Sequence, residues 1–298
     1  MNFFEALEKL KRTDAALIVF SLLDRIPIIV FGNNTSQIDS FLIEMSELLH
    51  FRKEFVFYTD FISLSEYLDL IQNESIDYNS QRAHVRCPSN VALKALNQFE
   101  RFDSWIIGIE IPDQNEKLNY FRKSIKKKIK SFLCISLLSE PIVVELEGLI
   151  LKQLDLSLEQ NLLQKISQDT EKSVAKMKRV LSEKIKANDF DVDLIESLLN
   201  FDVEKEELKK NIIKKEIQNF YSGSKRAFFI FSRLNLLNNI ESNTKIGSKT
   251  LLETIDYDDA PIERIISFIN KEWGEDFMNL IEKVKRVNAL DSMQSLWG

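Results

Sequence analysis

The side chains best placed for chemistry follow an apolar, β-branched run at residues 26–31. This run ends at Gly32, and four polar residues come directly after it, namely Asn33, Asn34, Thr35 and Ser36. Apolar side chains then recur at helical spacing from Ile38 to Leu49. A strand, a loop and a helix in this order place the N–H groups of a helix N-terminus where they can bind a phosphate.

Most of the chemistry of a standard phosphate-binding loop is missing here. The pattern Gly-x-x-x-x-Gly-Lys-Ser/Thr requires a second glycine, a lysine and a hydroxyl, but Gln37, Ile38 and Asp39 occupy these positions. An isoleucine cannot neutralise phosphate charge, and an aspartate repels it. We therefore expect a strand-to-helix turn at the edge of a sheet, not an ordinary site for a nucleoside triphosphate.

Two polar residues on later strands would face this loop in a nucleotide-binding protein. Glu110 ends an apolar run at residues 104–111, where an acid that organises magnesium would lie. Ser136 is on the next predicted strand, between that acid and a γ-phosphate. Each also has a simpler explanation, because apolar strands commonly end in glutamate and serine hydroxyls commonly bond to nearby backbone.

The elements that must position these residues alternate in the first half of the chain. Strands are predicted at residues 26–31, 54–60, 82–87, 104–111, 131–138 and 141–147. Helices are predicted between them, and Ser36 with Asp39 and Ser63 with Glu66 resemble capping boxes that would start two of these helices. This alternation predicts an α/β domain at residues 1–150, with three layers and a mainly parallel sheet.

Helical spacing dominates the rest of the chain, which predicts an all-α domain at residues 151–298. Residues 289–298 form its C-terminal tail, with the apolar side chains of Met293, Leu296 and Trp297. Exposed apolar side chains at a chain end are unfavourable unless something covers them. The tail therefore either docks on its own domain or binds a partner.

The order of these features resembles a degenerate P-loop ATPase of the AAA+ type, in particular a clamp-loader-like subunit. The resemblance joins the Gly32 loop, the strands of Glu110 and Ser136, and a helical domain that contains Ser222-Gly-Ser-Lys-Arg226. In that family a lid helix opens with Gly-x-x-Arg, whose arginine faces the γ-phosphate, and Gly223 and Arg226 have this spacing. A degenerate RecA-like domain would explain the first half nearly as well.

The resemblance implies a non-catalytic protein-interaction or accessory subunit in a DNA replication or repair assembly. The missing lysine argues against hydrolysis, so we expect no catalytic residue and no cofactor. The alternative is an ATPase or switch that binds ATP and magnesium through an unorthodox loop. Its cofactor-binding residues would be Gly32, Asn33, Asn34, Thr35, Ser36, Glu110 and Arg226.

Five cations gather on one predicted helix, namely Arg122, Lys123, Lys126, Lys127 and Lys130. Such a cluster creates a local positive field that could attract nucleic-acid phosphates. The solvated outer face of an amphipathic helix is the simpler explanation, and it agrees better with the net charge of −6.

Composition narrows the remaining classes of function. The two cysteines and two histidines lack the spacing of metal ligands, so no metal site is expected. No run approaches the roughly 20 apolar residues that a membrane span needs, and residues 1–10 form an amphipathic helix interrupted by acids instead of a signal sequence. We expect a cytoplasmic protein with protein partners and no membrane partner.

Overall fold

A computed structural model describes residues 2–74, 82–96, 98, 102, 104–111, 116–185, 200–240 and 244–282. It divides the chain into two compact units, Met1–Asn219 and Phe220–Gly298. The first unit contains a six-stranded sheet, and the described residues of the second unit are mainly helical. Within the described residues, no helix combines the length and the apolar character needed to cross a membrane.

The strands of the sheet are β1 (Ile28–Gly32), β2 (Lys53–Val56), β3 (Ala83–Cys87), β4 (Trp105–Glu110), β5 (Phe132–Ser136) and β6 (Val143–Glu147). Their order is β2-β3-β4-β1-β5-β6, and the first five are parallel. Strand β6 is antiparallel to β5, because the short connection between them allows a hairpin but no helical crossover. The mainly parallel α/β sheet predicted from the sequence is confirmed.

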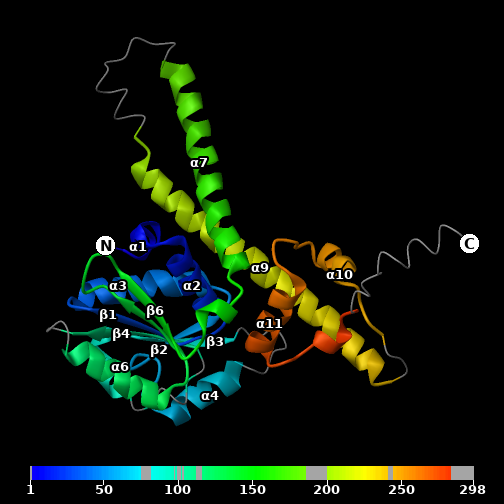
Figure 1. The fold of residues 1–298 in the computed structure, drawn as a ribbon, viewed down its shortest axis with the longest axis horizontal. Coiled ribbons are helices and arrows are strands. Elements are labelled where there is room, and N and C mark those ends of the chain that lie inside the picture. The colour runs from blue at the N-terminus through cyan, green and yellow to red at the C-terminus, as the bar shows by residue number, and fades with distance from the viewer. Residues whose placement is uncertain are drawn as a thin grey trace, which may run out of the picture. The chain divides into compact units, whose positions relative to one another are not determined.

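Helices cover both faces of the sheet, which gives three layers (Figure 1). One face carries α1 (Phe3–Lys9), α2 (Arg12–Leu23) and α3 (Thr35–Ser46), and the other carries α4 (Leu64–Glu74) and α6 (Glu116–Lys128). Every residue of β1 is buried, as an uninterrupted apolar strand between two helical layers should be.

The predicted cap of α4 is present. The hydroxyl of Ser63 accepts a hydrogen bond from the backbone N–H of Glu66 at 3.3 Å, and the Glu66 carboxylate accepts one from the N–H of Ile62 at 2.7 Å. The ring of Tyr67 on α4 then meets two rings from connecting segments, Phe61 before α4 and Phe102 before β4, and the three rings lie 5.0 to 5.3 Å apart. Phenylalanine therefore contributes much of this core.

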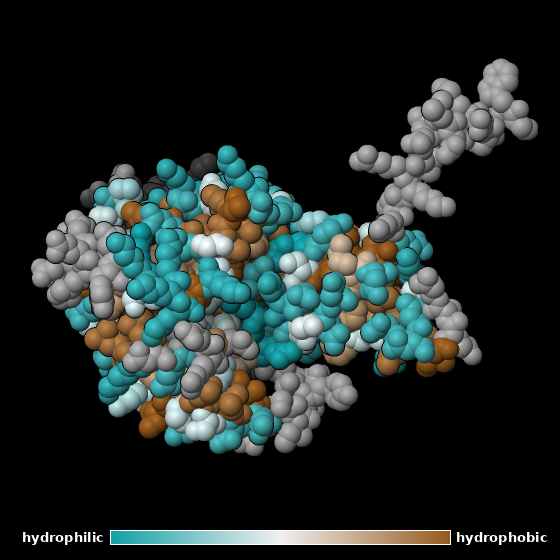
Figure 2. Space-filling view, turned by 60° about the horizontal axis from the view of Figure 1, so that its bottom comes forward, coloured by the Kyte–Doolittle hydropathy of each residue, from teal (hydrophilic) through white to brown (hydrophobic). Residues whose placement is uncertain are grey.

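Seen from the side of α4 and α6, hydrophilic residues cover most of the visible surface (Figure 2). Hydrophobic residues form separate smaller groups there. Among the exposed apolar side chains of this part of the chain are Tyr58, Ile62, Leu68 and Leu93. Single exposed apolar residues are normal on a folded protein and need no partner to explain them.

Beyond β6 the described residues form helices, apart from short turns and a β-bridge between Ile246 and Ile281. Helix α7 (Ser157–Ile185) packs against α2, and α9 (Asp202–Asn238) begins antiparallel to α7 (Figure 1). The ion pair between Lys165 and Glu216, at 2.8 Å, joins α7 to α9. Secondary structure thus changes near residue 150, whereas the first compact unit continues to Asn219.

The second unit contains the rest of α9 with α10 (Ser248–Ile255), α11 (Ile262–Trp273) and the 3-10 turn η5 (Met278–Leu280). Its core is aromatic, with Phe228 stacked on Trp273 at 4.8 Å and Phe231 stacked on Phe277 at 5.2 Å. Because stacking of aromatic rings adds to the burial of their surface, these pairs hold α9 to the end of α11 and to the segment that follows it.

Candidate functional site

The carboxyl ends of three adjacent strands bring the predicted residues to one edge of the sheet. Gly32 of β1 pairs in register with Glu110 of β4, and Phe31 pairs with Ser136 of β5. Helix α3, which follows β1, and helix α6, which follows β4, cover opposite faces of the sheet (Figure 1). In open α/β sheets, ligands bind in the crevice where neighbouring strands diverge in this way. The Gly32 edge is therefore the topologically expected place for a ligand.

The loop at this edge is short, because only Asn33 and Asn34 separate β1 from α3. Asn34 is the N-cap of α3, and its side-chain oxygen accepts a hydrogen bond from the N–H of Gln37 at 3.0 Å. The predicted capping box of Ser36 and Asp39 is wrong, since Ser36 already lies in the first turn. One of the N–H groups that would bind a phosphate is thus satisfied by the chain itself.

Ile38 fills the space next to this loop. Its side chain is fully buried, and a Cβ atom built on Gly32 would lie 2.7 Å from its Cγ1. A Cβ atom built on Gly108 of β4 would lie 2.4 Å from its Cγ2. The residue that stands in place of the phosphate-binding lysine is therefore a core residue, packed onto two glycines of adjacent strands.

Asp39 also has a structural contact. Its carboxylate accepts a hydrogen bond from the backbone N–H of Ser89 at 2.8 Å, which ties α3 to the 3-10 turn η2 (Ser89–Val91). Burial and then the charge of Asp39 raise the pKa of the Cys87 thiol far above its usual range. Cys87 is therefore held as a neutral thiol within the core.

The other residues proposed for a nucleotide lie in two separate parts of the chain. Asn33, Asn34, Ser36 and Glu110 are exposed to solvent, and Thr35 is half-buried. Arg226 belongs to the second unit, where it donates a hydrogen bond to the carbonyl of Asp256 at 3.4 Å.

The resemblance implied that Gly223 and Arg226 open a helix. They do not, because α9 begins at Asp202 and continues through them. The glycine has a packing role, since a Cβ atom there would lie 2.8 Å from Cβ of Tyr257. Close packing within the second unit therefore explains the glycine at this position.

The basic helix α6 is partly neutralised by the edge strand. Arg122 forms an ion pair with Glu145, and Lys126 forms one with Glu147 at 2.6 Å, both on β6. The side chains of Lys123, Lys127 and Lys130 are exposed. These ion pairs favour the explanation that α6 presents a solvated outer face. Of the remaining predicted residues, Met293, Leu296 and Trp297 lie outside the described part of the chain.

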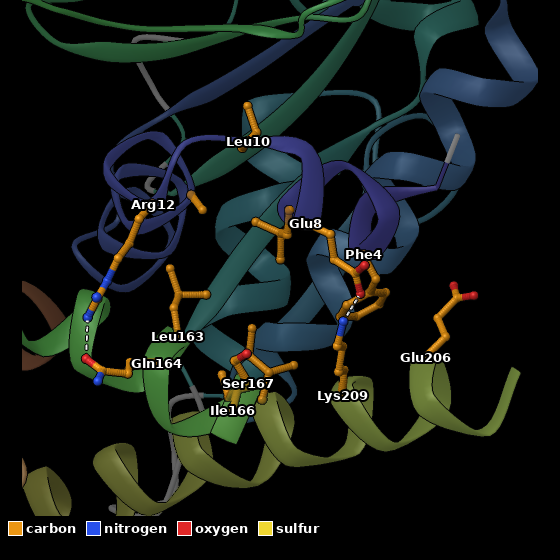
Figure 3. A pocket seen from close by; sticks show the side chains of 13 residues that line it. Phe4, Glu8, Leu10, Arg12, Leu163, Gln164, Ile166, Ser167, Glu206 and Lys209 are labelled. Atoms are coloured by element: carbon orange, nitrogen blue, oxygen red, sulfur yellow. Dashed lines mark hydrogen bonds and ion pairs between the residues drawn. The ribbon is translucent and has the colours of Figure 1, made fainter. Parts of the chain in front are cut away.

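A pocket of about 510 Å³ opens in the first unit among α1, α2, α7 and α9. Its floor is apolar and includes the buried side chains of Phe4, Ala15, Ile166 and Ile213. Polar residues line its rim, where Glu8 pairs with Lys209 and Arg12 donates to the side chain of Gln164 at 2.7 Å (Figure 3). The pocket therefore suits an apolar group better than a charged one.

A buried polar cluster was not anticipated from the sequence. Ser46 at the end of α3 donates a hydrogen bond to Glu54 of β2 at 3.1 Å, and Nε2 of His84 on β3 lies 2.7 Å from the same hydroxyl. Because the hydroxyl gives its proton to Glu54, it accepts one from His84, which fixes the histidine as the Nε2–H tautomer.

This cluster is not arranged for nucleophilic catalysis. In a catalytic triad the acid holds the histidine and the histidine takes the serine proton, whereas here the acid holds the serine. Burial, followed by the charges of Arg52, Arg25 and Arg86, lowers the pKa of His84 to about 3. His84 is therefore a neutral core residue, and sequence signals alone could not find the cluster because its members come from three elements.

No protein-family model matches the chain, and no curated protein or solved structure is significantly similar to it. Among the described residues, no group of three or more His, Cys, Asp or Glu side chains could hold a metal ion.

Proposed function

We propose that this chain is a non-catalytic accessory subunit that binds other proteins and is built on a degenerate AAA+-like P-loop fold. The observation that carries the proposal is Ile38, which packs against Gly32 and Gly108 at the edge where a nucleotide would bind. Loss of the lysine alone would leave an empty phosphate pocket. A buried isoleucine in its place fits a scaffold whose residues have adapted to one another.

The choice of fold family is supported by the neighbouring positions of Gly32, Glu110 and Ser136. In a P-loop ATPase these positions hold the phosphate loop, the magnesium-organising acid and the polar group near the γ-phosphate. The further step, to a DNA replication or repair assembly, rests on the sequence resemblance to clamp-loader-like subunits.

Equilibrium dialysis of the full chain with labelled ATP and magnesium tests the proposal. We expect no saturable binding at ligand concentrations up to about 1 mM, a concentration that detects even weak sites. A dissociation constant below this range would favour the alternative function below, and ATP hydrolysis that disappears in Glu110→Gln would refute the non-catalytic function.

The alternative function is an ATP-binding switch with an unorthodox loop. It is favoured by one observation, the exposure of Asn33, Ser36 and Glu110 at the switch point of the sheet. In this case Ser36→Ala should weaken ATP binding in the same dialysis, while Ser65→Ala, an exposed hydroxyl of α4, should leave it unchanged.

Pull-down from the native source, with the full chain and with a chain that ends at residue 288, tests for protein partners. Partners captured by both chains would use surfaces outside residues 289–298. Partners lost from the shorter chain would assign the interaction to the tail at residues 289–298, which contains Met293, Leu296 and Trp297.

A further inference from the structure

The second half of α9 carries apolar side chains on two opposite faces. One face is buried within the second unit, where Ala227 and Phe231 are fully buried and Phe231 stacks on Phe277. The opposite face, about half a turn around the helix, carries Phe229, Leu236 and Leu237. Their exposed fractions are 43%, 60% and 53%, and Ile240, in the turn that ends α9, is 74% exposed.

A surface helix is normally polar on the face that points away from its core, and a helix that is apolar all round is normally buried. This part of α9 thus has a second apolar face that the described residues do not cover. The exposed residues also include two arginines. Together they form the α9 stripe, which consists of Arg226, Phe229, Arg233, Leu236, Leu237 and Ile240.

The residues of the α9 stripe recur at intervals of three and four residues. This is the spacing at which one helix packs its seam against another helix, and it is the pattern of anchors in helix-in-groove recognition. The geometry therefore favours a helix as the occupant. An extended strand would contact every second residue and would not match the spacing.

The charges on the stripe indicate the chemistry of that helix. Arg233 makes no hydrogen bond or ion pair with any residue in the described part of the chain, and Arg226 makes the 3.4 Å hydrogen bond to the carbonyl of Asp256. The stripe itself contains no acidic residue. A partner would therefore have to supply carboxylates to match the two guanidinium groups.

A second copy of this chain fits poorly. In an antiparallel pairing centred on the stripe, Phe229 would face Leu237, but Arg233 would face its own copy. In a parallel pairing, both arginines would face their own copies. Like charges placed opposite each other disfavour either arrangement.

We propose that the α9 stripe is a docking surface for an amphipathic helix of another protein, with aliphatic residues along its seam and Asp or Glu beside them. The proposal deepens the function proposed above and rests on it for the expectation of a protein partner. It assigns the interaction to one surface and one class of partner segment.

The probe is a fluorescein-labelled synthetic helix of about three heptads, with leucine on the seam and glutamate beside it. Its binding to the full chain is followed by fluorescence anisotropy. We expect saturable binding that becomes about tenfold or more weaker in Leu236→Glu/Leu237→Glu and in Arg226→Glu/Arg233→Glu. Asn239→Glu adds an acid at an exposed site beside the stripe and should bind the probe nearly as the unmodified chain does.

Three results would overturn the proposal. The first is equal binding by the unmodified chain and both double variants, and the second is equally tight binding of a matched probe with lysine in place of glutamate. The third is about tenfold tighter binding by a chain that ends at Glu282, because residues 283–298 would then occupy the stripe themselves. Circular dichroism checks that each variant is folded. Failure here would leave the ATP dialysis result unchanged, so the two proposals can fail separately.

Discussion

Lys214 of α9 donates a hydrogen bond to Oε2 of Glu47 at 2.7 Å, and Lys210, one turn earlier, lies 3.0 Å from the same oxygen. Glu47 follows α3 directly, so this shared carboxylate fastens the start of α9 to the α/β layer of the first unit. Burial alone would raise the pKa of Glu47, but the hydrogen bonds from Lys214 and Lys210 outweigh it, and the pKa is lowered.

Glu47→Gln should lower the free energy of unfolding at pH 7 by about 1 kcal/mol, a modest value because all three side chains are partly exposed. A carboxyl with a depressed folded pKa stabilises the fold above its unfolded pKa, near 4.5, and loses this effect as pH falls through the folded pKa. The difference between the two proteins should therefore vanish in acid. Urea unfolding of the unmodified chain and of Glu47→Gln, from pH 7 down to acid pH, measures this difference in stability. Glu171→Gln, which changes an exposed acid of α7, is the control. A difference in stability that stays constant at all pH values would contradict the assignment of this stabilisation to the ionised carboxylate of Glu47.

His84 should make stability depend on pH over a different window. Its folded pKa of about 3 lies below the ordinary value of 6.5, so the unfolded chain binds the extra proton between these values. Stability should therefore rise with pH from about 3 to 6.5, with a slope from this residue of up to about 1.4 kcal/mol per pH unit, and then level off.

Urea unfolding of His84→Gln tests this expectation. The slope below pH 6.5 should become shallower, and His50→Gln, which makes the same substitution at an exposed histidine, serves as the control. An unchanged slope in His84→Gln would show that His84 is not the group that titrates.

Gly108→Ala should destabilise the chain mainly through Ile38, because the added Cβ would lie farther from Leu42 and Ser89, at 3.1 and 3.3 Å. The added Cβ would lie 2.4 Å from Cγ2 of Ile38, and overpacking of this kind costs about 1–3 kcal/mol. Ile38→Ala removes the clashing atoms, so Gly108→Ala should cost clearly less in the Ile38→Ala background. A double-mutant cycle of unfolding free energies measures the coupling. Additive effects of the two substitutions would mean that Ile38 does not fill the space beside Gly108.

Helix α6 should bind single-stranded DNA only weakly. With the exposed cations Lys123, Lys127 and Lys130 as the phosphate contacts, the slope of log K against log salt should be about −2. Glu145→Gln with Glu147→Gln releases Arg122 and Lys126, and the slope should steepen to about −3.5. Anisotropy titrations with a labelled oligonucleotide at several salt concentrations provide the values. A triple Lys→Glu variant that binds equally well would exclude α6 as the contact surface.

Local patterns in the sequence were sufficient for the sheet and for the grouping of Gly32, Glu110 and Ser136. A short apolar run that ends in polar residues is readily assigned as a strand. Parallel strands with helical crossovers have their carboxyl ends at the same edge of the sheet, so the residues that follow them lie together. The cap of α3 was predicted wrongly at Ser36, because Asn34 and Ser36 are both good N-cap residues and only the geometry of the turn selects Asn34.

Contacts between distant segments could not be predicted in the same way. A glycine within a helical pattern is usually taken as a break, but Gly223 lies inside α9, where the absence of a side chain leaves room for Tyr257. The positive field expected on α6 is reduced by Glu145 and Glu147, which come into reach only because β6 lies beside β5. The cluster of Ser46, Glu54 and His84 likewise depends on the register of β2 and β3.

The two carboxylates of β6 have a consequence for how large the sheet can become. In the part of the chain that the structure describes, strand β6 is at the edge with a neighbour on one side only, and such a strand can recruit another strand from a second molecule. Glu145 and Glu147 place charges along this edge and engage side chains of α6, so an approaching strand would have to displace ion pairs and bury acids. We therefore expect β6 to resist pairing with a second molecule at its edge of the sheet, which would limit aggregation there.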